Sequence, residues 1–261
     1  MMLPSKLGSY ILLTADLALS DLEVSPLCVN GMKLLTYAHD LGGIPLTQSM
    51  ANFNRRCVEW AAGEFRWPGY EPDDLYAVNK VLNEPDFPPL FGLHSMFLTT
   101  RLIRHFKGKA VLTKAGRAVL GQHGRLQAQL FDRAFFDSDP YGGDPRVIEA
   151  GLWDVGHILT VVSNRLGDWV SLADFTEWSV PVDIFPTTGP LGAKHNAMLF
   201  VSLNAVRPLS WLGLIEVEKG EGGLGNLGGR HLRKTVLFDK FVRLQACKQE
   251  VSVCIKWSRQ T

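Results

Sequence analysis

The chain has 261 residues, of which 46% are hydrophobic and 20% are charged, and its formal net charge is +1. This composition is typical of a folded protein and excludes a disordered one, and the length suffices for one large domain or two ordinary ones. The apolar stretch of residues 7–19 is broken by Asp16, is too short to cross a bilayer, and lacks the flanks of a signal peptide. The four cysteines have no framework spacing, so we expect a protein of the reducing cytoplasm.

The near-neutral total hides an alternation of acidic and basic segments. Residues 1–100 carry 6 Lys and Arg against 11 Asp and Glu, whereas residues 101–131 carry 7 against 0. Residues 132–193 carry 3 against 10, and residues 228–261 carry 8 against 2. Segments with such an excess of one sign attract partners of the opposite charge, either another molecule or the acidic segments of this same chain.

The first half of the chain predicts a series of helices followed by a hairpin. Helix-spaced apolar residues lie within residues 26–43, a short extended piece follows at 44–47, and a second helix is predicted within 48–65. A short helical stretch at 75–82 precedes a helix that begins at Pro88 and Pro89. Residues 102–113 predict a β-hairpin with its turn at 107–109, and Thr113 is the predicted N-cap of a further helix at 114–121.

The second half predicts the same order of elements. A helix within residues 152–168 precedes a short extended piece and a small helix within 169–178. After a loop at 182–196, a long apolar helix within 197–213 is expected to end or bend near Pro208. Residues 214–218 and 230–236 predict a second hairpin, and residues 237–244 a last helix.

The repeated order predicts an α+β fold, mainly helical, of two tandem winged helix-turn-helix units, each with a β-hairpin wing. Pro, Gly and Asp cluster at residues 137–146, which separates the two periodic halves. We therefore predict a first unit with an N-terminal extension at residues 1–136, a linker at 137–146 and a second unit at 147–261.

Several phrases of the sequence resemble a known bacterial region. They are "GIPLTQSMANFNRRCVEWA", "WPGYEPDDLYAVNKVLNEPDFPPL", "RHFKGKAVLTKAGRAVL", and "RPLSWLGLIE" together with "RKTVLFDKF". The region is an uncharacterised one that occurs alone or beside domains of the plasmid ORF-3-like family, which is associated with mobile elements. The resemblance covers roughly residues 25–245 and is clearest in 43–121. It implies a bacterial cytoplasmic protein and agrees with a winged-helix fold, and it implies no activity and no catalytic residues.

The stretch "KGEGGLGNLGGR" at residues 219–230 is the feature that looks most like a ligand-binding motif. Gly220, Gly222 and Gly225 satisfy the dinucleotide fingerprint and follow a predicted strand, with Asp239 downstream. That fingerprint requires a helix to open at the loop, however, and the residues that follow predict another strand. We interpret residues 220–229 as the exposed and mobile tip of the second hairpin, and we expect no cofactor.

The basic segment gives the strongest indication of function. The candidate phosphate-contacting residues, which lie on the two predicted wings and their flanks, are Arg101, Arg104, Lys107, Lys109, Lys114, Arg117, Arg230, Arg233 and Lys234. Lys and Arg at such positions release counterions when they bind phosphates. The alternative is a solvated basic edge that prevents strand-to-strand association, or a protein-binding surface. Few Lys or Arg precede each wing on the predicted helices, which counts against DNA binding.

Asn52, Asn54, Arg55 and Arg56 form a polar cluster at a predicted helix start and are candidates for contacting base edges or a partner. These residue types are equally ordinary at N-caps and on surfaces, and we favour that interpretation. In the phrase "FRWPGY", Trp67 and the nearby tyrosine are predicted to be partly exposed, whereas the other tryptophans are expected in the core.

No motif indicates a catalytic or metal site. Cys247 and Cys254 could share a helix face, but no nearby histidine completes a zinc site. The acids at Asp137 and Asp139 lack the later ligands of a calcium loop, and His94 is expected in the core. An enzyme remains a third possibility, because catalytic groups assemble from distant residues.

The sequence thus predicts a non-catalytic protein that binds duplex DNA through its basic wings. The alternative is a protein-interaction scaffold with the same fold, which binds a partner or associates with itself through complementary charged segments.

Overall fold

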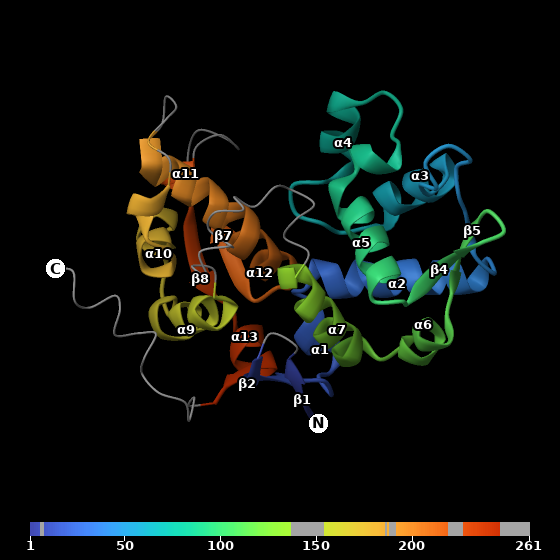
Figure 1. The fold of residues 1–261 in the computed structure, drawn as a ribbon. Coiled ribbons are helices and arrows are strands. Elements are labelled where there is room, and N and C mark those ends of the chain that lie inside the picture. The colour runs from blue at the N-terminus through green and yellow to red at the C-terminus, as the bar shows by residue number, and fades with distance from the viewer. Residues whose placement is uncertain (6–7, 137–153, 186, 188–191, 219–226, 246–261) are drawn as a thin grey trace.

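The computed structural model describes residues 1–261 except 6–7, 137–153, 186, 188–191, 219–226 and 246–261. The described chain is mostly helical and holds three small antiparallel sheets of three strands each (Figure 1). No described helix is both long enough and apolar enough to pass through a lipid bilayer.

The first unit is built around the sheet β3-β5-β4. Its elements are α2 (Pro26–Asp40), β3 (Ile44–Pro45), α3 (Arg55–Glu64), α4 (Pro72–Val78), η1 (Glu84–Asp86), α5 (Pro88–Thr99), β4 (Ile103–Phe106), β5 (Lys109–Leu112) and α6 (Lys114–Val119). Consecutive strands β4 and β5 form a hairpin, and the short early strand β3 adds to the outer edge of β5. The predicted extended piece, hairpin and flanking helices are therefore confirmed.

The second unit repeats this arrangement around the sheet β6-β8-β7. Its elements are α9 (Val155–Arg165), β6 (Val170–Ser171), α10 (Leu172–Ser179), η3 (Val182–Ile184), α11 (Gly192–Val201), η4 (Ser202–Val206), α12 (Arg207–Trp211), β7 (Ile215–Glu218), η5 (Leu227–Gly229), β8 (His231–Lys234) and α13 (Val236–Phe241). The early strand β6 pairs with β8 just as β3 pairs with β5, so the order of strands is the same in the two sheets.

The two units also share the turn that leads into each hairpin. After α5, Leu102 N–H donates to the Phe97 carbonyl and Thr113 Oγ1 donates to the Arg101 carbonyl at 2.6 Å. After α12, Leu214 N–H donates to the Leu209 carbonyl, and the hydroxyl of Thr235 donates in the same way to the Gly213 carbonyl at 2.7 Å. Thr113 and Thr235 also cap α6 and α13, which confirms the cap expected at Thr113.

A third sheet joins the beginning of the chain to the end of the second unit. Its order is β1-β2-β9, formed by β1 (Met2–Ser5), β2 (Gly8–Thr14) and β9 (Val242–Leu244). These strands pack beside α7 (His123–Phe136), which follows the first unit, and α1 (Leu19–Leu22) leads from β2 toward α2. The sequence patterns did not predict this sheet.

Buried side chains link the two units through α7. Gln127 is fully buried, accepts a hydrogen bond from Ser25 Oγ at 2.9 Å and donates one to the Leu212 carbonyl at 2.8 Å. Nearby, the rings of Trp67 and Trp211 meet edge to face with centroids 5.0 Å apart. The first and second units therefore share a packed and hydrogen-bonded boundary.

Three expectations need correction. The second helix begins at Arg55, because Asn54 caps it and residues 47–53 form a loop closed by a bridge between Leu46 and Phe53. Trp67 is buried, since it packs against Trp211 of the second unit. Leu227, expected in an exposed tip, is also buried. Residues 220–226 of that tip lie outside the described residues, as does the predicted linker at 137–146.

Candidate nucleic-acid interface

The β4–β5 hairpin carries the basic segment and has a tight turn at its tip. Phe106 pairs with Lys109 across the hairpin, and Lys107 and Gly108 between them have φ values of +49° and +72°. Two consecutive residues with positive φ form the turn that matches the right-handed twist of paired strands. The turn therefore projects the Lys107 side chain from the end of the hairpin, where it is exposed.

Side chains alternate along β4, so that its two faces differ. Ile103 is buried, and His105 on the same face reaches back to His94 of α5. On the opposite face, the guanidinium of Arg104 lies 4.8 Å from the ring centroid of Phe106, and the Lys107 ammonium lies 5.4 Å from the same centroid. Phe106 is 46% exposed, so an aromatic ring with two cations against it faces solvent.

The remaining cations surround the base of the hairpin. Arg101 occupies the first residue after the C-cap of α5 with a φ of +57°, and Lys114 begins α6. Gly116 allows α6 to approach closely, since a Cβ there would lie 2.1 Å from the Leu102 carbonyl oxygen. Arg117 donates to the Leu112 carbonyl at 2.9 Å and remains exposed.

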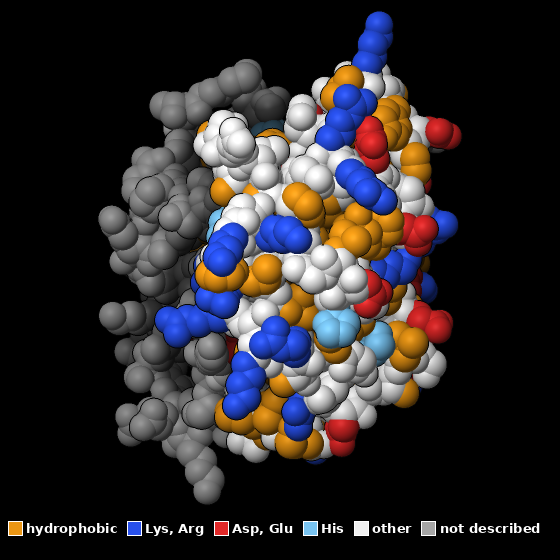
Figure 2. All heavy atoms as spheres, turned by 90° about the vertical axis from the view of Figure 1, so that its right-hand side faces the viewer, with side chains coloured by type: hydrophobic (Ala, Val, Ile, Leu, Met, Phe, Trp, Pro, Cys, Tyr) orange, Lys and Arg blue, Asp and Glu red, His pale blue; other side chains and the backbone are white. Residues whose placement is uncertain are grey.

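We call these six exposed cations, all of them predicted from the sequence, the basic hairpin surface: Arg101, Arg104, Lys107, Lys109, Lys114 and Arg117. Within the described part of the chain, none of the six forms an ion pair with an acid. Figure 2 faces this side of the molecule; Lys and Arg spread over its left and middle, and Asp and Glu lie mostly toward its right edge. The surface therefore has a net positive charge that no acid of the described residues neutralises through an ion pair.

The cations of the second hairpin differ from those of the first, because each has a partner within its own unit. Arg233 forms an ion pair with Glu216 at 2.7 Å and lies over the Trp169 ring, and Lys234 pairs with Asp239 at 2.8 Å. Arg230 donates to Ser202 Oγ at 3.1 Å. Each of these three predicted residues is half-buried and has a partner within its own unit.

The two hairpins do not form one surface. In Figure 1, β4 and β5 lie on one side of the molecule, and β7 and β8 lie on the opposite side, with α7 and α12 between them. The two predicted wings are therefore separated by the helices between them.

The polar cluster near the start of α3 is largely engaged in local structure. Asn54 Oδ1 accepts from Cys57 N–H at 3.1 Å as the helix cap, and Asn52 forms backbone hydrogen bonds with Thr47. Arg55 pairs with Glu59 at 2.8 Å one turn along the helix, whereas Arg56 is exposed without an ion pair among the described residues.

A buried polar chain behind the hairpin is the feature that sequence reasoning missed. Glu84 of η1, 1% exposed, lies 2.6 Å from His94 Nδ1, and His94 Nε2 lies 3.0 Å from His105 Nε2 on β4. His94 is a buried core histidine as expected, but its contacts connect a buried carboxylate to the hairpin. Burial and, to a lesser extent, His94 lower the pKa of His105, while Glu84 opposes them. Residues 84, 94 and 105 have no recognisable spacing, so only the fold brings them together.

The thiol of Cys57, which lies near Glu84, is unreactive because its surroundings disfavour the thiolate. Burial, with a smaller contribution from the Glu84 charge, raises the pKa of Cys57 to about 12, and burial raises the pKa of Cys28 to about 12 as well. Nucleophilic or metal-binding cysteines have lowered pKa values. Among the described residues, no group of three or more His, Cys, Asp or Glu is placed to hold a metal ion.

Comparison with known proteins relates the part of the chain that carries this surface to one family. Residues 23–125 match the family model of the Y4jL N-terminal domain. A protein of Sinorhizobium fredii with the name uncharacterized protein y4jL is 47% identical over 97 residues, which are 37% of this chain and 44% of that protein. The chain thus spans less than half of the length of this relative. No solved structure matches the chain.

The match of residues 23–125 contains the whole first unit, from α2 to α6. The basic hairpin surface and the Glu84–His94–His105 chain therefore both lie within the stretch that is similar to the Y4jL N-terminal domain. The second unit lies beyond it.

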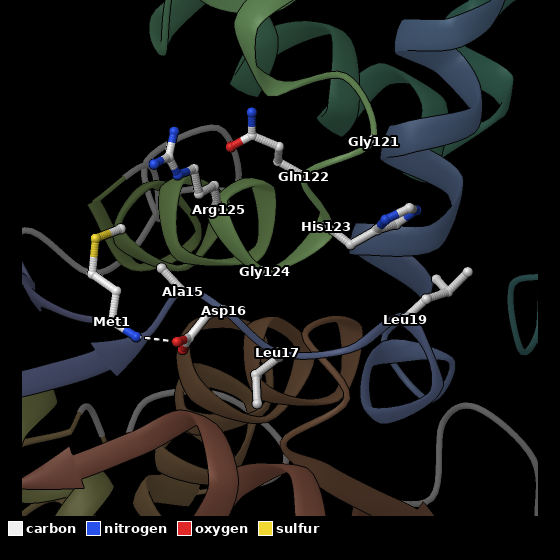
Figure 3. A pocket seen from close by; sticks show the side chains of 10 residues that line it. All are labelled: Met1, Ala15, Asp16, Leu17, Leu19, Gly121, Gln122, His123, Gly124 and Arg125. Atoms are coloured by element: carbon white, nitrogen blue, oxygen red, sulfur yellow. Dashed lines mark hydrogen bonds and ion pairs between the residues drawn. The ribbon is translucent and has the colours of Figure 1, made fainter.

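A recess of about 630 Å³ lies between β2 and the start of α7 (Figure 3). The Asp16 carboxylate in it faces the amino-terminal nitrogen of Met1, and the side chains of Gln122 and Arg125 extend away from that pair. Its polar groups do not converge on a common point, so the recess lacks the arrangement of a catalytic site.

Proposed function

We propose that the chain is a non-catalytic DNA-binding protein of two winged-helix units, and that the first unit contacts duplex phosphates through the basic hairpin surface. The order of helices and strands in each unit, and the sheet orders β3-β5-β4 and β6-β8-β7, support the winged-helix assignment. A location in the bacterial cytoplasm and an association with mobile elements belong to the same proposal; the resemblance of the sequence supports them.

The observation that carries the proposal is that all six cations are exposed and form no ion pair with any of the described residues. Surface cations that serve stability are usually placed beside acids, as Arg233 and Lys234 are in the second hairpin. Six cations without an ion-pair partner among the described residues repel one another, and a polyanion relieves that repulsion while it releases its condensed counterions. The side-by-side placement of Arg104, Phe106 and Lys107 further suits a hairpin that lies along a sugar–phosphate backbone.

The surroundings of α5 support binding that depends little on base sequence. In a winged helix the helix before the hairpin usually enters the major groove. Here α5 contains no Lys or Arg, and its Gly92 lies against Trp211 of the second unit, where an added Cβ would be 3.5 Å from the ring. The affinity is therefore expected to arise from phosphate contacts, with a steep dependence on salt.

Binding of a random duplex, measured by fluorescence anisotropy across a salt series, tests the proposal. Lys107, Lys109 and Lys114, each replaced by Glu, should lower the affinity by at least about a hundredfold at low salt and flatten the salt dependence. The control replaces Lys80, which follows α4, Lys194 of α11 and Lys240 of α13 by Glu, which changes the net charge equally outside the hairpin. Because Lys194 and Lys240 pair with Glu177 and Asp21, circular dichroism must show that this variant is folded. Equal loss in both variants, or no loss in the first, would refute the hairpin as the binding surface.

The separation of the two hairpins favours a second candidate, a protein-interaction scaffold. Tyr76 and Val78 of α4 and Val81 just after it are 43%, 82% and 45% exposed, and the acids Asp73 and Asp74 lie in the first turn of the same helix. Such an acidic and apolar patch suits a basic protein surface, including the hairpin of a second copy. Light scattering during gel filtration at low and high salt distinguishes this candidate, because self-association through charge should disappear in salt.

A further inference from the structure

The Glu84–His94–His105 chain runs from the protein interior to the basic hairpin surface. Its members come from η1, α5 and β4, with Glu84 1% exposed, His94 6% exposed and His105 exposed. Their contacts are 2.6 Å from Glu84 Oε1 to His94 Nδ1 and 3.0 Å from His94 Nε2 to His105 Nε2. The hydrogen-bond chain therefore connects a buried carboxylate to an exposed imidazole of the hairpin, on the face of β4 opposite Arg104.

The buried end of this chain is held by further contacts. The second oxygen of Glu84 accepts the backbone N–H of Phe53, and the Phe53 ring stacks on the His94 imidazole with centroids 3.9 Å apart. Glu84 follows Asn83, whose backbone N–H donates to Asp86 in a capping box. Both oxygens of Glu84 thus have a defined partner, and the His94 ring has a fixed orientation.

This geometry dictates the direction of the hydrogen bonds. A carboxylate only accepts, so His94 Nδ1 carries a hydrogen that it donates to Glu84. The two Nε2 atoms, 3.0 Å apart, share one further hydrogen. If the histidine pair has no excess proton, His94 Nε2 must accept, His105 Nε2 must donate, and His105 Nδ1 is left as a bare acceptor.

One excess proton reverses the character of His105 Nδ1. If the charge resides on His105, both of its nitrogens carry hydrogen. If the charge resides on His94, its Nε2 donates, so neutral His105 carries its hydrogen on Nδ1. In either case His105 Nδ1 becomes a donor, and no acceptor of the described residues occupies it. A phosphate oxygen, which only accepts, can bind the pair in this state and not in the other.

We propose that His105 is a phosphate-binding residue of the hairpin and that DNA binding is accompanied by uptake of one proton at the His94–His105 pair. This inference rests on the proposed function, since it concerns how the same surface holds phosphate. His105 is not a free surface imidazole: Glu84 and His94 act as positioning residues that set which of its nitrogens faces the ligand.

The groups around the pair determine the pH range. Glu84 on η1 contacts His94, and Cys57 on α3 keeps its proton because its pKa is raised to about 12. Arg104, Lys107 and Lys109 belong to the same hairpin as His105, with Arg104 on the opposite face of β4. Burial, followed by His94, lowers the pKa of His105 from its ordinary value. Bound phosphates favour the protonated pair. The gain in affinity is therefore complete below the pKa of the free protein and is lost as the pH rises through the pKa of the complex.

The experiment measures binding of a random duplex from about pH 5.5 to 8.5 at constant ionic strength for the full chain, for His105→Gln and for His231→Gln. His231 is an exposed histidine of the second hairpin and serves as the matched control. Wild type and His231→Gln should bind about tenfold more tightly at the low end, whereas His105→Gln should be nearly flat. Calorimetry in two buffers of different ionisation enthalpy should give uptake of about one proton, which His105→Gln abolishes.

The outcomes separate this inference from the proposed function. Tight, salt-dependent binding that does not change with pH, or a pH dependence that persists in His105→Gln, overturns the inference and leaves the DNA-binding proposal intact. The absence of binding at any pH overturns both. Nitrogen chemical shifts of the imidazoles in the free wild-type protein give a separate test at a pH where the histidine pair has no excess proton. They must show hydrogen on Nδ1 of His94 and on Nε2 of His105. Any other tautomer refutes the proposed Glu84–His94–His105 hydrogen-bond chain.

Discussion

Two residues of the basic hairpin surface, Arg101 and Lys107, have backbone conformations that suit glycine. Their φ values are +57° and +49°. In the second unit the residue equivalent to Arg101 is Gly213, with a φ of +70°. A non-glycine residue in this region costs about 1 kcal/mol. The first unit tolerates this cost at two positions, and both carry a cation of the candidate interface.

Replacement of these two cations should therefore separate stability from binding. Arg101→Gly and Lys107→Asn should each raise the free energy of unfolding by about 0.5–1 kcal/mol, because the new residues accept positive φ more readily. Each should weaken duplex binding several-fold through the lost charge. Urea unfolding and anisotropy measure the two effects.

The matched control for this pair is Ala51→Gly, at a residue with a φ of +54° in the loop before α3. It should stabilise the protein comparably and leave binding unchanged. A loss of stability in Arg101→Gly and Lys107→Asn would contradict the assigned strain.

The buried thiols lead to a prediction about reactivity. With a pKa of about 12, Cys28 and Cys57 are thiolates to about one part in ten thousand at pH 8. Iodoacetamide should leave both unmodified in the folded protein at that pH and modify both in denaturant, as read by peptide mass spectrometry. Rapid modification of either thiol in the folded state would show that it is accessible and ionised.

At the scale of elements, the hairpins depend on the threonine that follows them. Thr113 Oγ1 accepts from Gly116 N–H at 3.1 Å and donates to the carbonyl of Arg101, so it ties the cap of α6 to the end of α5. In the second unit the Thr235 hydroxyl caps α13 and donates to the Gly213 carbonyl after α12, so it connects these two helices in the same way. Each hairpin is thereby closed at its base by one side chain.

Loss of this side chain should loosen the hairpin. Thr113→Ala should cost about 1–2 kcal/mol of unfolding free energy, and Thr113→Ser should restore most of it because the hydroxyl returns. In Thr113→Ala, hydrogen exchange should accelerate at β4 and β5 and stay unchanged at β7 and β8. Acceleration in both hairpins would instead indicate a general loss of stability.

The sequence predicted the elements of both units because their signals are local. Helical spacing, the residues at the hairpin turn and the cap at Thr113 act within a few residues of one another. The sheet β1-β2-β9 depends on pairing between Ile11 and Leu244, which no local pattern reveals. The long helix was expected to end or bend near Pro208, but α12 continues through Pro208 to Trp211. The wider turn of η4 that precedes it, in which Arg207 N–H bonds to the Ser202 carbonyl, was not predicted.

The same distinction applies to the candidate site. The exposure of the hairpin cations could be predicted, because Lys and Arg side chains on a short hairpin extend into solvent. The ion pairs of Arg233 and Lys234 could not, since their acids lie on β7 and α13 and contact them only after folding. The Glu84–His94–His105 chain was missed for the same reason.

At the scale of the whole molecule, the buried amide of Gln127 fixes one unit against the other. It satisfies the hydroxyl of Ser25 at the start of α2 and the carbonyl of Leu212 at the end of α12. Replacement by Ala leaves the hydroxyl hydrogen of Ser25 and the carbonyl of Leu212 without these buried partners, which costs far more than a surface contact.

Gln127→Ala should therefore lower the free energy of unfolding by about 2–4 kcal/mol. Gln122→Ala, at an exposed glutamine just before α7, is the control and should change it by less than about 0.5 kcal/mol. Denaturant unfolding followed by tryptophan fluorescence and circular dichroism should coincide in the wild type and separate in Gln127→Ala. Equal effects of the two substitutions would mean that Gln127 does not join the units.

The placement of the two hairpins on different sides of the molecule has a consequence for the proposed DNA binding (Figure 1). If the basic hairpin surface is the binding surface, as proposed, a duplex on β4 and β5 should leave β7 and β8 without contact. The expected footprint of a single chain is then that of one small module, and longer protection of DNA should need several chains side by side.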